Sequence, residues 1–327
     1  MNYEILFMLI LFILVPLLVV KIVIDNLKMK TVRYTELDNN KVLEYQKLIN
    51  NNASLKNINI FRKILLILFI ILVSIVFIEL VIMQEDIPIF IYVIPIIIFA
   101  AYIIINSNYN KRFKSVIVSD VIKHYDANLE YNPSLGIPIN DYEYADFEHF
   151  DKYYSEDLIS GNILNCPFIM SDVKTEKLER DTDGDRTYTT IFNGVVSKVN
   201  LNKNINAFIY IINNNIRLFD NKYKVNIDNE TFIQRYDTYS DNEVLAMRLL
   251  SPSVTTSILD MENKTGIKFE IKINNNIMFF RFYTNNLFLI NQSSSKSAKN
   301  LVYSIEVIDD MKNIIASILE ILQSMEV

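Results

Sequence analysis

The sequence is poor in cysteine, histidine and glycine. It has one cysteine in 327 residues, so no intrachain disulfide can form, and two histidines with one cysteine are too few for a typical zinc site. Five glycines, scattered singly, form no glycine-rich phosphate loop, which disfavours ordinary nucleotide-binding folds. The formal net charge of −6 offers no basic surface for a nucleic-acid backbone. We therefore expect no cofactor, no metal site and no nucleic-acid partner.

Apolar residues are in excess, at 51% of the chain, and they crowd into the first 105 positions. Three apolar segments cover residues 5–24, 64–83 and 87–105, and at about 1.5 Å per residue each approaches the roughly 30 Å of a bilayer core. The first segment lacks a basic start and a small-residue cleavage site, which favours an uncleaved anchor over a signal peptide. We predict a transmembrane anchor over residues 1–25 and a transmembrane hairpin over residues 64–105.

Few polar residues interrupt these segments. Glu79 would cost about 2.5–3.5 kcal/mol at the bilayer centre, but it lies near the end of a segment made almost entirely of Leu, Ile, Val and Phe. Pro88 suits a helix start, and Pro95 predicts a kink that a membrane helix tolerates. Glu79 and Ser74 are the candidates for a buried transport path, and three helices are few for a transporter that does not oligomerise.

Lysine and arginine are distributed unevenly around the apolar segments. The tip at residues 84–86 has none, whereas two other stretches are rich in them. These are Lys28, Lys30, Arg33, Lys41, Lys47, Lys56, Arg62 and Lys63 before the hairpin, and Lys111, Arg112, Lys114 and Lys123 after it. The positive-inside rule then predicts a multi-pass protein of the cell membrane, with its N-terminus outside and residues 26–63 as a basic cytoplasmic segment. The lipid bilayer is thus the first expected partner. These cations could also contact anionic lipid at about 1 kcal/mol per residue, but a plain role in topology is preferred.

The rest of the chain predicts an α+β fold, in which N-terminal transmembrane helices precede a cytoplasmic domain with a mainly antiparallel sheet and packed helices. Residues 38–60 favour a short amphipathic helix that lies on the bilayer or against the domain. Residues 106–130 favour a juxtamembrane helix that ends near Tyr125. The soluble α+β domain then covers residues 131–327.

Turn and cap residues mark the elements of this domain. Strands are expected over residues 163–176 and 187–200, joined at 181–185, over 206–212, and as a hairpin over 267–273 and 277–283. A capping box at residues 240–243 opens a helix through Leu250, and a second helix begins at Pro252 and ends before Gly266. Residues 293–299 favour a loop, and residues 300–324 favour a closing helix.

Several local patterns recur in a recognisable order. They are Lys111-Arg112-Phe113-Lys114-Ser115-Val116-Ile117, Tyr131-Asn132-Pro133 with Gly136-Ile137, Ser155-Glu156-Asp157-Leu158-Ile159-Ser160-Gly161, Phe192-Asn193-Gly194, Tyr239-Ser240-Asp241, and Met247-Arg248-Leu249-Leu250-Ser251-Pro252. In this order they resemble an uncharacterised bacterial membrane-anchored family, the domain of unknown function number 3137, from about residue 62 to 290. The resemblance implies two membrane helices followed by a soluble domain, and no activity.

Candidate reactive residues have simpler interpretations. Asp181, Asp183 and Asp185 resemble a calcium loop, but its twelfth position is Phe192 instead of Glu, which favours a hairpin tip. The two histidines, His124 and His149, are expected at the surface, with no nucleophile elbow near His149. Cys166 precedes Pro167 in a strand-like run and is expected to be buried. The aromatic cluster of Phe147, Phe150, Tyr153 and Tyr154 is expected in the core, with a peptide- or lipid-contacting patch as the alternative.

No catalytic set stands out, so two classes of function remain open. The leading hypothesis is a membrane-tethered cytoplasmic interaction or scaffold module, which holds a protein or lipid partner at the inner membrane face without chemistry. The alternative is an enzyme that acts on a membrane-proximal substrate through one dense acidic cluster. That cluster consists of Asp146, Glu148, Asp151, Glu156 and Asp157.

Overall fold

The computed structural model describes residues 37–78, 89–180, 186–214, 223–284, 286–288, 290 and 293–325. All of them belong to one compact unit, Leu37–Val327. The predicted first anchor over residues 1–25, Glu79, the hairpin tip at 84–86 and the aspartates of 181–185 lie outside the described residues.

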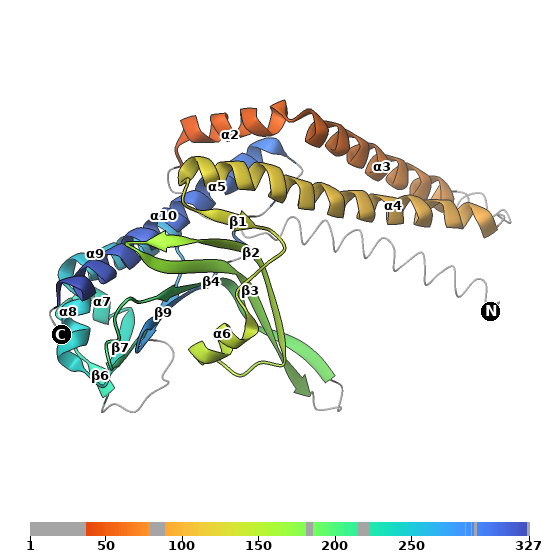
Figure 1. Ribbon diagram of the computed structural model, residues 1–327. Helices are drawn as coiled ribbons and strands as arrows, with labels where there is room; N and C mark the ends of the chain where they lie inside the picture. Colours follow the sequence, from red (N-terminus) through yellow and green to blue (C-terminus); the bar gives the residue numbers. More distant parts are fainter. Residues whose placement is uncertain are drawn as a thin grey trace. The chain divides into compact units, whose positions relative to one another are not determined.

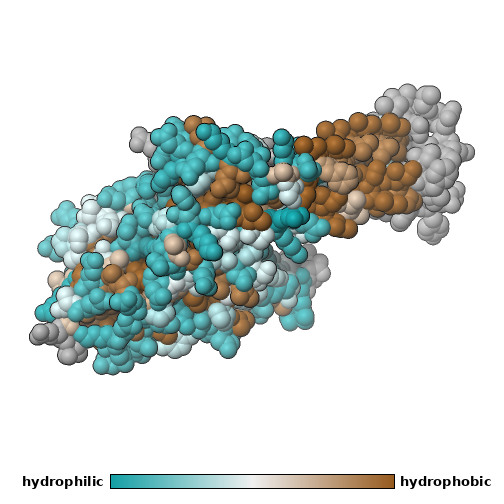
Figure 2. All heavy atoms as spheres, turned by 45° about the horizontal axis from the view of Figure 1, so that its top comes forward, coloured by the Kyte–Doolittle hydropathy of each residue, from teal (hydrophilic) through white to brown (hydrophobic). Residues whose placement is uncertain are grey.

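Two long apolar helices dominate the first part of this unit (Figure 1). They are α3 (Ala53–Ile78) and α4 (Ile89–Phe113), which pack against each other. By length and composition, Ala53–Val76 and Val93–Tyr125 are each sufficient to cross a membrane. Only 11% and 17% of their most apolar stretches is buried, whereas a core helix of a soluble protein would be mostly buried. Figure 2 shows hydrophobic residues gathered over these helices and a more hydrophilic surface elsewhere.

Helix α3 begins earlier than the predicted membrane segment. The Asn52 side chain accepts a hydrogen bond from the Leu55 amide at 3.0 Å, so the helix begins eleven residues before residue 64, at Ala53. The basic residues Lys56, Arg62 and Lys63 therefore belong to α3, whereas Lys56 was expected in the short helix over residues 38–60 and the other two after it.

Helix α2 (Asn39–Asn51) covers the first part of the amphipathic helix predicted over residues 38–60, and the residues from Ala53 on belong to α3. Asp38 caps it by accepting hydrogen bonds from the amides of Asn40 and Lys41. The helix packs against α10 and buries Val42, Tyr45 and Ile49. Of the two predicted positions, the one against the domain is therefore observed.

The chain leaves α4 through η2 (Lys114–Val118), a π-helical turn, and continues as α5 (Ser119–Tyr125). The prediction that this helix ends near Tyr125 is confirmed. Asp126 adopts an extended conformation at its carboxyl end.

Nine strands form one sheet within the described residues, in the order β1-β2-β3-β4-β9-β8-β5-β7-β6. The strands are β1 (Glu130–Asn132), β2 (Lys152–Ile163), β3 (Cys166–Arg180), β4 (Arg186–Asn200), β5 (Phe208–Asn213), β6 (Lys224–Val225), β7 (Tyr236–Ser240), β8 (Phe269–Asn274) and β9 (Ile277–Phe282). Every neighbouring pair is antiparallel, as predicted for this α+β domain.

The predicted hairpins β3–β4 and β8–β9 are both present, but β2 was not predicted. The pairing of β2 with β3 shifts between Glu156 and Ile159, and Asp157 has a positive φ of 63°. This bulge interrupts the alternation of inward and outward side chains, which is the signal by which a strand is recognised.

Five more helices complete the described fold: α6 (Ile139–Ala145), α7 (Glu230–Ile233), α8 (Glu243–Leu249), α9 (Pro252–Thr265) and α10 (Ser294–Ser324). Helix α9 has the predicted ends, with Gly266 at φ 68° after its last turn.

Two helix starts differ from the prediction. The cap of α8 is Asn242, whose side chain accepts from the Leu245 amide, while Ser240 ends strand β7 and accepts from the Asn242 amide. Residues 293–299 are not a loop, because α10 begins at Ser294. Ser297 and Ala298 are buried in its first turns, so tertiary packing outweighs their polar local sequence.

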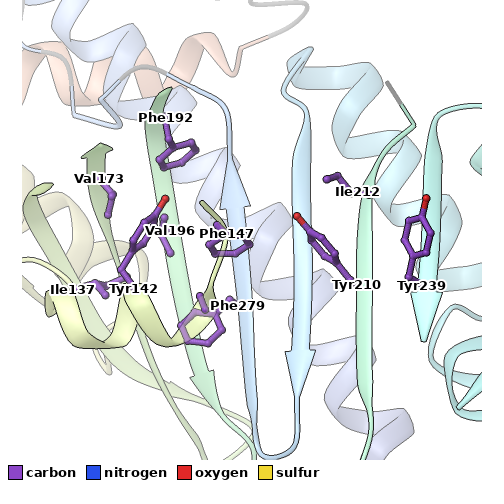
Figure 3. Close-up of a cluster of buried hydrophobic side chains, with 11 residues drawn as sticks. Ile137, Tyr142, Phe147, Val173, Phe192, Val196, Tyr210, Ile212, Tyr239 and Phe279 are labelled. Atoms are coloured by element: carbon purple, nitrogen blue, oxygen red, sulfur yellow. The ribbon is translucent and has the colours of Figure 1, made fainter. Parts of the chain in front are cut away.

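The sheet has a hydrophobic core on one face around α6 (Figure 3). The described core residues are Ile137, Tyr142, Ala145, Phe147, Val173, Phe192, Val196, Tyr210, Ile212, Tyr239 and Phe279. Alternation along β9 directs its neighbouring buried side chains, Phe280 and Phe282, to the opposite face. The sheet is thus buried on both faces, which places the charged side chains of its central strands inside the protein.

Candidate functional site

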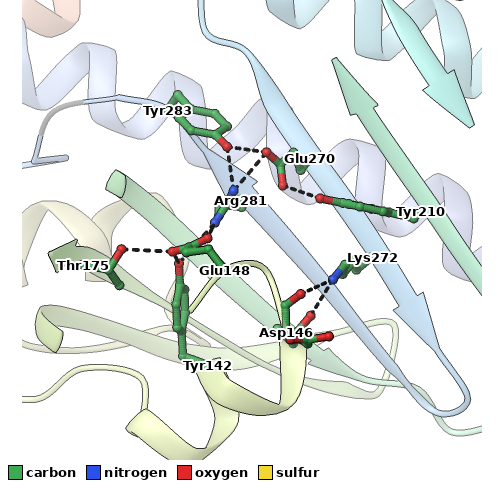
Figure 4. Close-up of polar contacts among 10 residues, drawn as sticks. Tyr142, Asp146, Glu148, Thr175, Tyr210, Glu270, Lys272, Arg281 and Tyr283 are labelled. Atoms are coloured by element: carbon green, nitrogen blue, oxygen red, sulfur yellow. Dashed lines mark hydrogen bonds and ion pairs between the residues drawn. The ribbon is translucent and has the colours of Figure 1, made fainter. Parts of the chain in front are cut away.

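A cluster of buried polar side chains lies on the central strands β8 and β9 (Figure 4). We call it the central polar network; it consists of Tyr142, Glu148, Thr175, Tyr210, Glu270, Lys272, Arg281 and Tyr283. Strands β8 and β9 set its geometry, because their register places Glu270 directly opposite Arg281. The α6 region contributes Tyr142 and Glu148.

Arg281 joins the two carboxylates of this network. Its Nη1 donates to Glu148 and its Nη2 donates to Glu270 Oε1 at 3.0 Å. The Nη2 atom also donates to Tyr283 Oη at 2.6 Å, and the Tyr283 hydroxyl donates to Glu270. The Arg281 side chain is only 7% exposed and that of Glu270 is 1% exposed, so this pair lies away from water, whereas Glu148 is 20% exposed.

Aromatic rings enclose the Arg281 guanidinium. Its Cζ lies 4.4 Å from the ring centroid of Phe147, 4.7 Å from that of Phe192 and 5.1 Å from that of Tyr283. Desolvated cation–π contacts of this kind contribute about 2 kcal/mol.

Further donors satisfy the carboxylate oxygens. Tyr142 Oη donates to Glu148 Oε1 at 2.5 Å, and Thr175 Oγ1 donates to the same atom at 3.0 Å. Tyr210 Oη donates to Glu270 Oε2 at 2.8 Å. Lys272 Nζ donates to the backbone carbonyls of Ala145 and Asp146, at 2.9 and 2.5 Å.

Burial shifts the pKa values of these groups. It raises the pKa of Glu270, against the opposing effect of the hydrogen bonds from Tyr283 and Tyr210. It also raises the pKa of Tyr142 and of Tyr283 to about 12. The tyrosines therefore remain protonated near neutral pH and act as fixed donors. With two carboxylates and two cations, the network is balanced in charge and cross-links α6, β8 and β9.

A second cluster lies where the π-helical turn meets the sheet. We call it the junction network; it consists of Lys114, Tyr131, Glu156, Asp157 and Asp172. Lys114 Nζ lies 2.5 Å from Asp157 Oδ2 and 3.2 Å from Glu156 Oε1. Tyr131 Oη donates to Asp157 Oδ1 at 2.5 Å. The bulge in β2 turns Asp157 toward Lys114, so that η2 is tied to the sheet.

Asp172, like Asp157, is a buried carboxylate of the junction network. Burial and the nearby charge of Asp157 raise its pKa well above the usual value. Both of its oxygens accept from the Leu287 amide at 3.0 Å, and Ser304 of α10 donates to the Leu287 carbonyl. The junction network therefore connects η2, three strands and α10.

The structure separates the acidic cluster that the sequence suggested. Glu148 pairs with Arg281, while Glu156 and Asp157 pair with Lys114. Asp151 accepts a hydrogen bond from the Leu178 amide at 2.7 Å, and Asp146 follows α6 in a left-handed conformation. The five carboxyl groups thus serve different contacts and form no single acidic site.

The other predicted candidates take ordinary positions. His124 and His149 are exposed, and Cys166 is buried at the start of β3. Phe147, Phe150 and Tyr153 pack in or against the core, whereas Tyr154 is half exposed, so the core interpretation of the aromatic cluster is right for three of four residues. Within the described residues, no group of three or more metal-ligating side chains gathers.

Sequence reasoning missed Lys114, Glu270, Lys272 and Arg281 as members of buried networks. Glu270 and Arg281 alternate with apolar residues in the predicted hairpin, and the sequence analysis assigned them no role. Counting outward from the turn at 275–276 pairs these two residues across the strands. That pairing was available from the sequence, but the burial of both faces was not.

Comparison with known proteins gives little further guidance. No curated protein matches. Among solved structures, the crystal structure of the mycobacterial trehalose monomycolate transport factor A, TtfA, aligns with a TM-score of 0.33 and 8% sequence identity, covering 61% of this chain and 95% of that one. A similarity this low carries no functional argument.

A family comparison is more informative. A family model matches residues 190–325 of this chain. This range overlaps the expected range of about 62–290 and extends beyond it into α10, while the motifs before residue 190 lie outside the match. The resemblance found in the sequence is therefore confirmed: residues 190–325 match the family described as protein of unknown function (DUF3137).

Proposed function

We propose that this protein is a membrane-tethered interaction module, whose α+β domain holds a protein partner at the cytoplasmic face of the membrane. In this proposal α3 and α4 cross the bilayer, together with the predicted anchor over residues 1–25. The main supporting observation is that two membrane-length apolar helices pack together, and that α4 continues through η2 and α5 into a domain whose buried carboxylates are held by ion pairs or hydrogen bonds.

The surface chemistry of α3 and α4 supports insertion. Neither helix contains an Asp or Glu. Large apolar side chains point outward along both of them, with Ile67 at 57% exposed, Ile97 at 61% and Ile104 at 60%. Contiguous exposed apolar surface on this scale is unfavourable in water and favourable in lipid.

The domain is firmly attached to the helices that leave the apolar region. The junction network binds Lys114 to β2, and Tyr125 Oη donates to Asp309 of α10 at 2.7 Å. Lys312 of α10 pairs with Asp126 at 2.5 Å, and α2 packs along the same helix. A tether of this kind suits a domain that must be held at a fixed place, as a scaffold requires.

The distribution of reactive groups favours binding over chemistry. The carboxylates of the central polar network are held by Arg281 and by tyrosine donors. In the junction network, Glu156 and Asp157 are held by Lys114 and Tyr131, and Asp172 is held by the Leu287 amide. The acidic residues proposed for an enzyme are dispersed among these contacts, so the enzymatic alternative gains no support from their arrangement.

Helix α8 offers an apolar contact for a partner. Val244 is 62% exposed and Met247 is 45% exposed, and they lie one turn apart on the same helix. Exposed aliphatic and methionine side chains of this kind are typical of adaptable protein contacts.

Site-specific photo-crosslinking in cells tests the proposal. A photoreactive phenylalanine analogue at Val244 is expected to give one discrete light-dependent adduct, and the same analogue at exposed Lys268, outside α8, serves as the control. Recovery of the same abundant proteins from both positions would contradict a specific partner. A companion alkaline carbonate wash is expected to leave the full chain in the membrane fraction, and its release would contradict insertion.

A further inference from the structure

Five cations lie within two helical turns of the contact between Arg62 of α3 and Asn106 of α4. We call this group the cationic belt; it consists of Lys56, Arg62 and Lys63 on α3, and Lys111 and Arg112 on α4. Arg62 of α3 lies beside Asn106 of α4, because its Nη1 donates to Asn106 Oδ1 at 2.8 Å. This contact aligns the two helices along their axes. Lys56 and Arg112 are each six residues from this contact, or about 9 Å along the helix axis.

The belt lacks compensating negative charge among the described residues. Arg62 is 2% exposed, and its guanidinium is held by the neutral side chains of Asn59 and Asn106 and by the Tyr109 ring, 4.1 Å from Cζ. Lys56, Lys63, Lys111 and Arg112 are exposed, and none forms an ion pair within the described part of the chain.

The contrast with the next lysine is informative. Lys114 follows Arg112 by two residues and is paired with two carboxylates. The protein carries an excess of acidic residues, with a net charge of −6, yet none of them pairs with the belt in the described structure. Uncompensated positive charge at the end of an apolar helical pair is complementary to the phosphate of an anionic lipid.

We infer that the cationic belt is a binding site for the phosphodiester headgroups of anionic phospholipids. Exposed Lys63, Lys111 and Arg112 make the direct contacts, and buried Arg62 holds the two helices together beneath them and adds a fixed positive charge. This inference rests on the part of the proposed function that places α3 and α4 in the bilayer, and it adds a defined lipid class to that proposal.

The test uses the full chain in neutral detergent micelles, titrated with phosphatidylglycerol or with phosphatidylcholine. The readouts are the thermal unfolding midpoint and the lipid retained in native mass spectra. We expect phosphatidylglycerol to raise the midpoint and to be retained, and phosphatidylcholine to do neither. Inorganic phosphate at matched concentration is expected to have no effect, and an equal effect would assign the site to free phosphate and overturn the inference.

A triple variant isolates the belt. Lys63→Gln with Lys111→Gln and Arg112→Gln should weaken retention of phosphatidylglycerol on the order of 100-fold, since each basic residue near the lipid surface contributes about fivefold. The matched control carries the same change of charge at exposed Lys268, Lys296 and Lys299, and should retain lipid like the original chain. Unchanged midpoints in phosphatidylcholine show that both variants fold.

Two further results would overturn the inference. One is an original chain that does not distinguish the two lipids, and the other is an equal loss of lipid in the belt variant and in the control, which would indicate an effect of net charge alone. If the chain is instead extracted by the carbonate wash, the proposed function fails. If the chain stays in the membrane but retains phosphatidylglycerol and phosphatidylcholine equally, only the proposed lipid site is contradicted.

Discussion

At the scale of single residues, Arg281 is a buried cation that pairs with two carboxylates. Its side chain is 7% exposed and pairs with both Glu148 and Glu270, while the charge of Lys272 also acts on Glu270. Buried ion pairs contribute little net stability when intact, but removing one partner leaves the other charge buried and unpaired.

We expect Arg281→Gln to lower the free energy of unfolding by about 3–5 kcal/mol, measured by urea unfolding of the full chain in detergent. Lys177→Gln is the control, because Lys177 is exposed and its replacement should change the value by no more than about 0.5 kcal/mol. A loss below about 1 kcal/mol for Arg281→Gln would mean that the two carboxylates are not dependent on this guanidinium.

Asp172 gives a pH-dependent prediction. Its pKa is raised in the folded protein by burial and by Asp157, with Glu156 raising and Lys114 lowering it. The stability that it contributes is therefore complete below its unfolded pKa of 3.8 and is lost as the pH rises through the folded pKa. Asp172→Asn keeps an acceptor for the Leu287 amide without the charge.

We expect the Asp172→Asn variant to be more stable than the original chain at about pH 7, and this difference to shrink as the pH falls toward about 4. The measurement is the urea midpoint across this range, with exposed Asp260→Asn as a control that should show no such trend. A variant that is less stable at every pH would indicate that the charged carboxylate is favourable in place.

At the scale of elements, the close pairing of β4 and β9 depends on Gly194. A Cβ atom added there would lie 1.8 Å from the Phe282 carbonyl oxygen, at the point where the two strands begin to pair. Gly266 is constrained by its backbone conformation instead of by space. A Cβ atom there would meet no neighbour within 4 Å, but its φ of 68° at the end of α9 is left-handed.

We therefore expect the two glycines to respond differently to substitution. Gly194→Ala and Gly194→Asn should both destabilise the protein by about 3 kcal/mol, because any side chain forces the strands apart. Gly266→Asn should be milder than Gly266→Ala, because asparagine tolerates the left-handed conformation. The unfolding midpoints of the four variants check this, and a harmless Gly194→Ala would refute the close approach.

At the scale of the whole molecule, the distribution of basic residues predicts the sidedness. The domain and the residues between the first two apolar segments should face the cytoplasm, and the tip at residues 84–86 should face outward. The native thiol does not interfere, because Cys166 is 1% exposed in the folded chain.

We expect a membrane-impermeant maleimide to label Glu85→Cys in intact cells, and to label Lys177→Cys in the domain only after the membrane is permeabilised. The unsubstituted chain is the control for Cys166. Labelling of Lys177→Cys in intact cells would reverse the proposed orientation without affecting the fold.

Much of the architecture follows from local sequence. The apolar runs, the ends of α9 at Pro252 and Gly266, and the β8–β9 hairpin were all predictable, because caps, turns and periodicity act over a few residues. Strand β2 and the first turns of α10 were not. A bulge at Asp157 and burial of Ser297 override the local signals there.

The sequence alone determined the α+β class, the membrane-length segments and the scarcity of residues for metal or nucleotide chemistry. Only the tertiary structure decided which charges meet. Glu148 and Arg281 are 133 residues apart, and Lys114 and Asp157 are 43 apart. Such pairs form because the fold buries both faces of the sheet, and a buried charge must find a partner wherever the chain brings one.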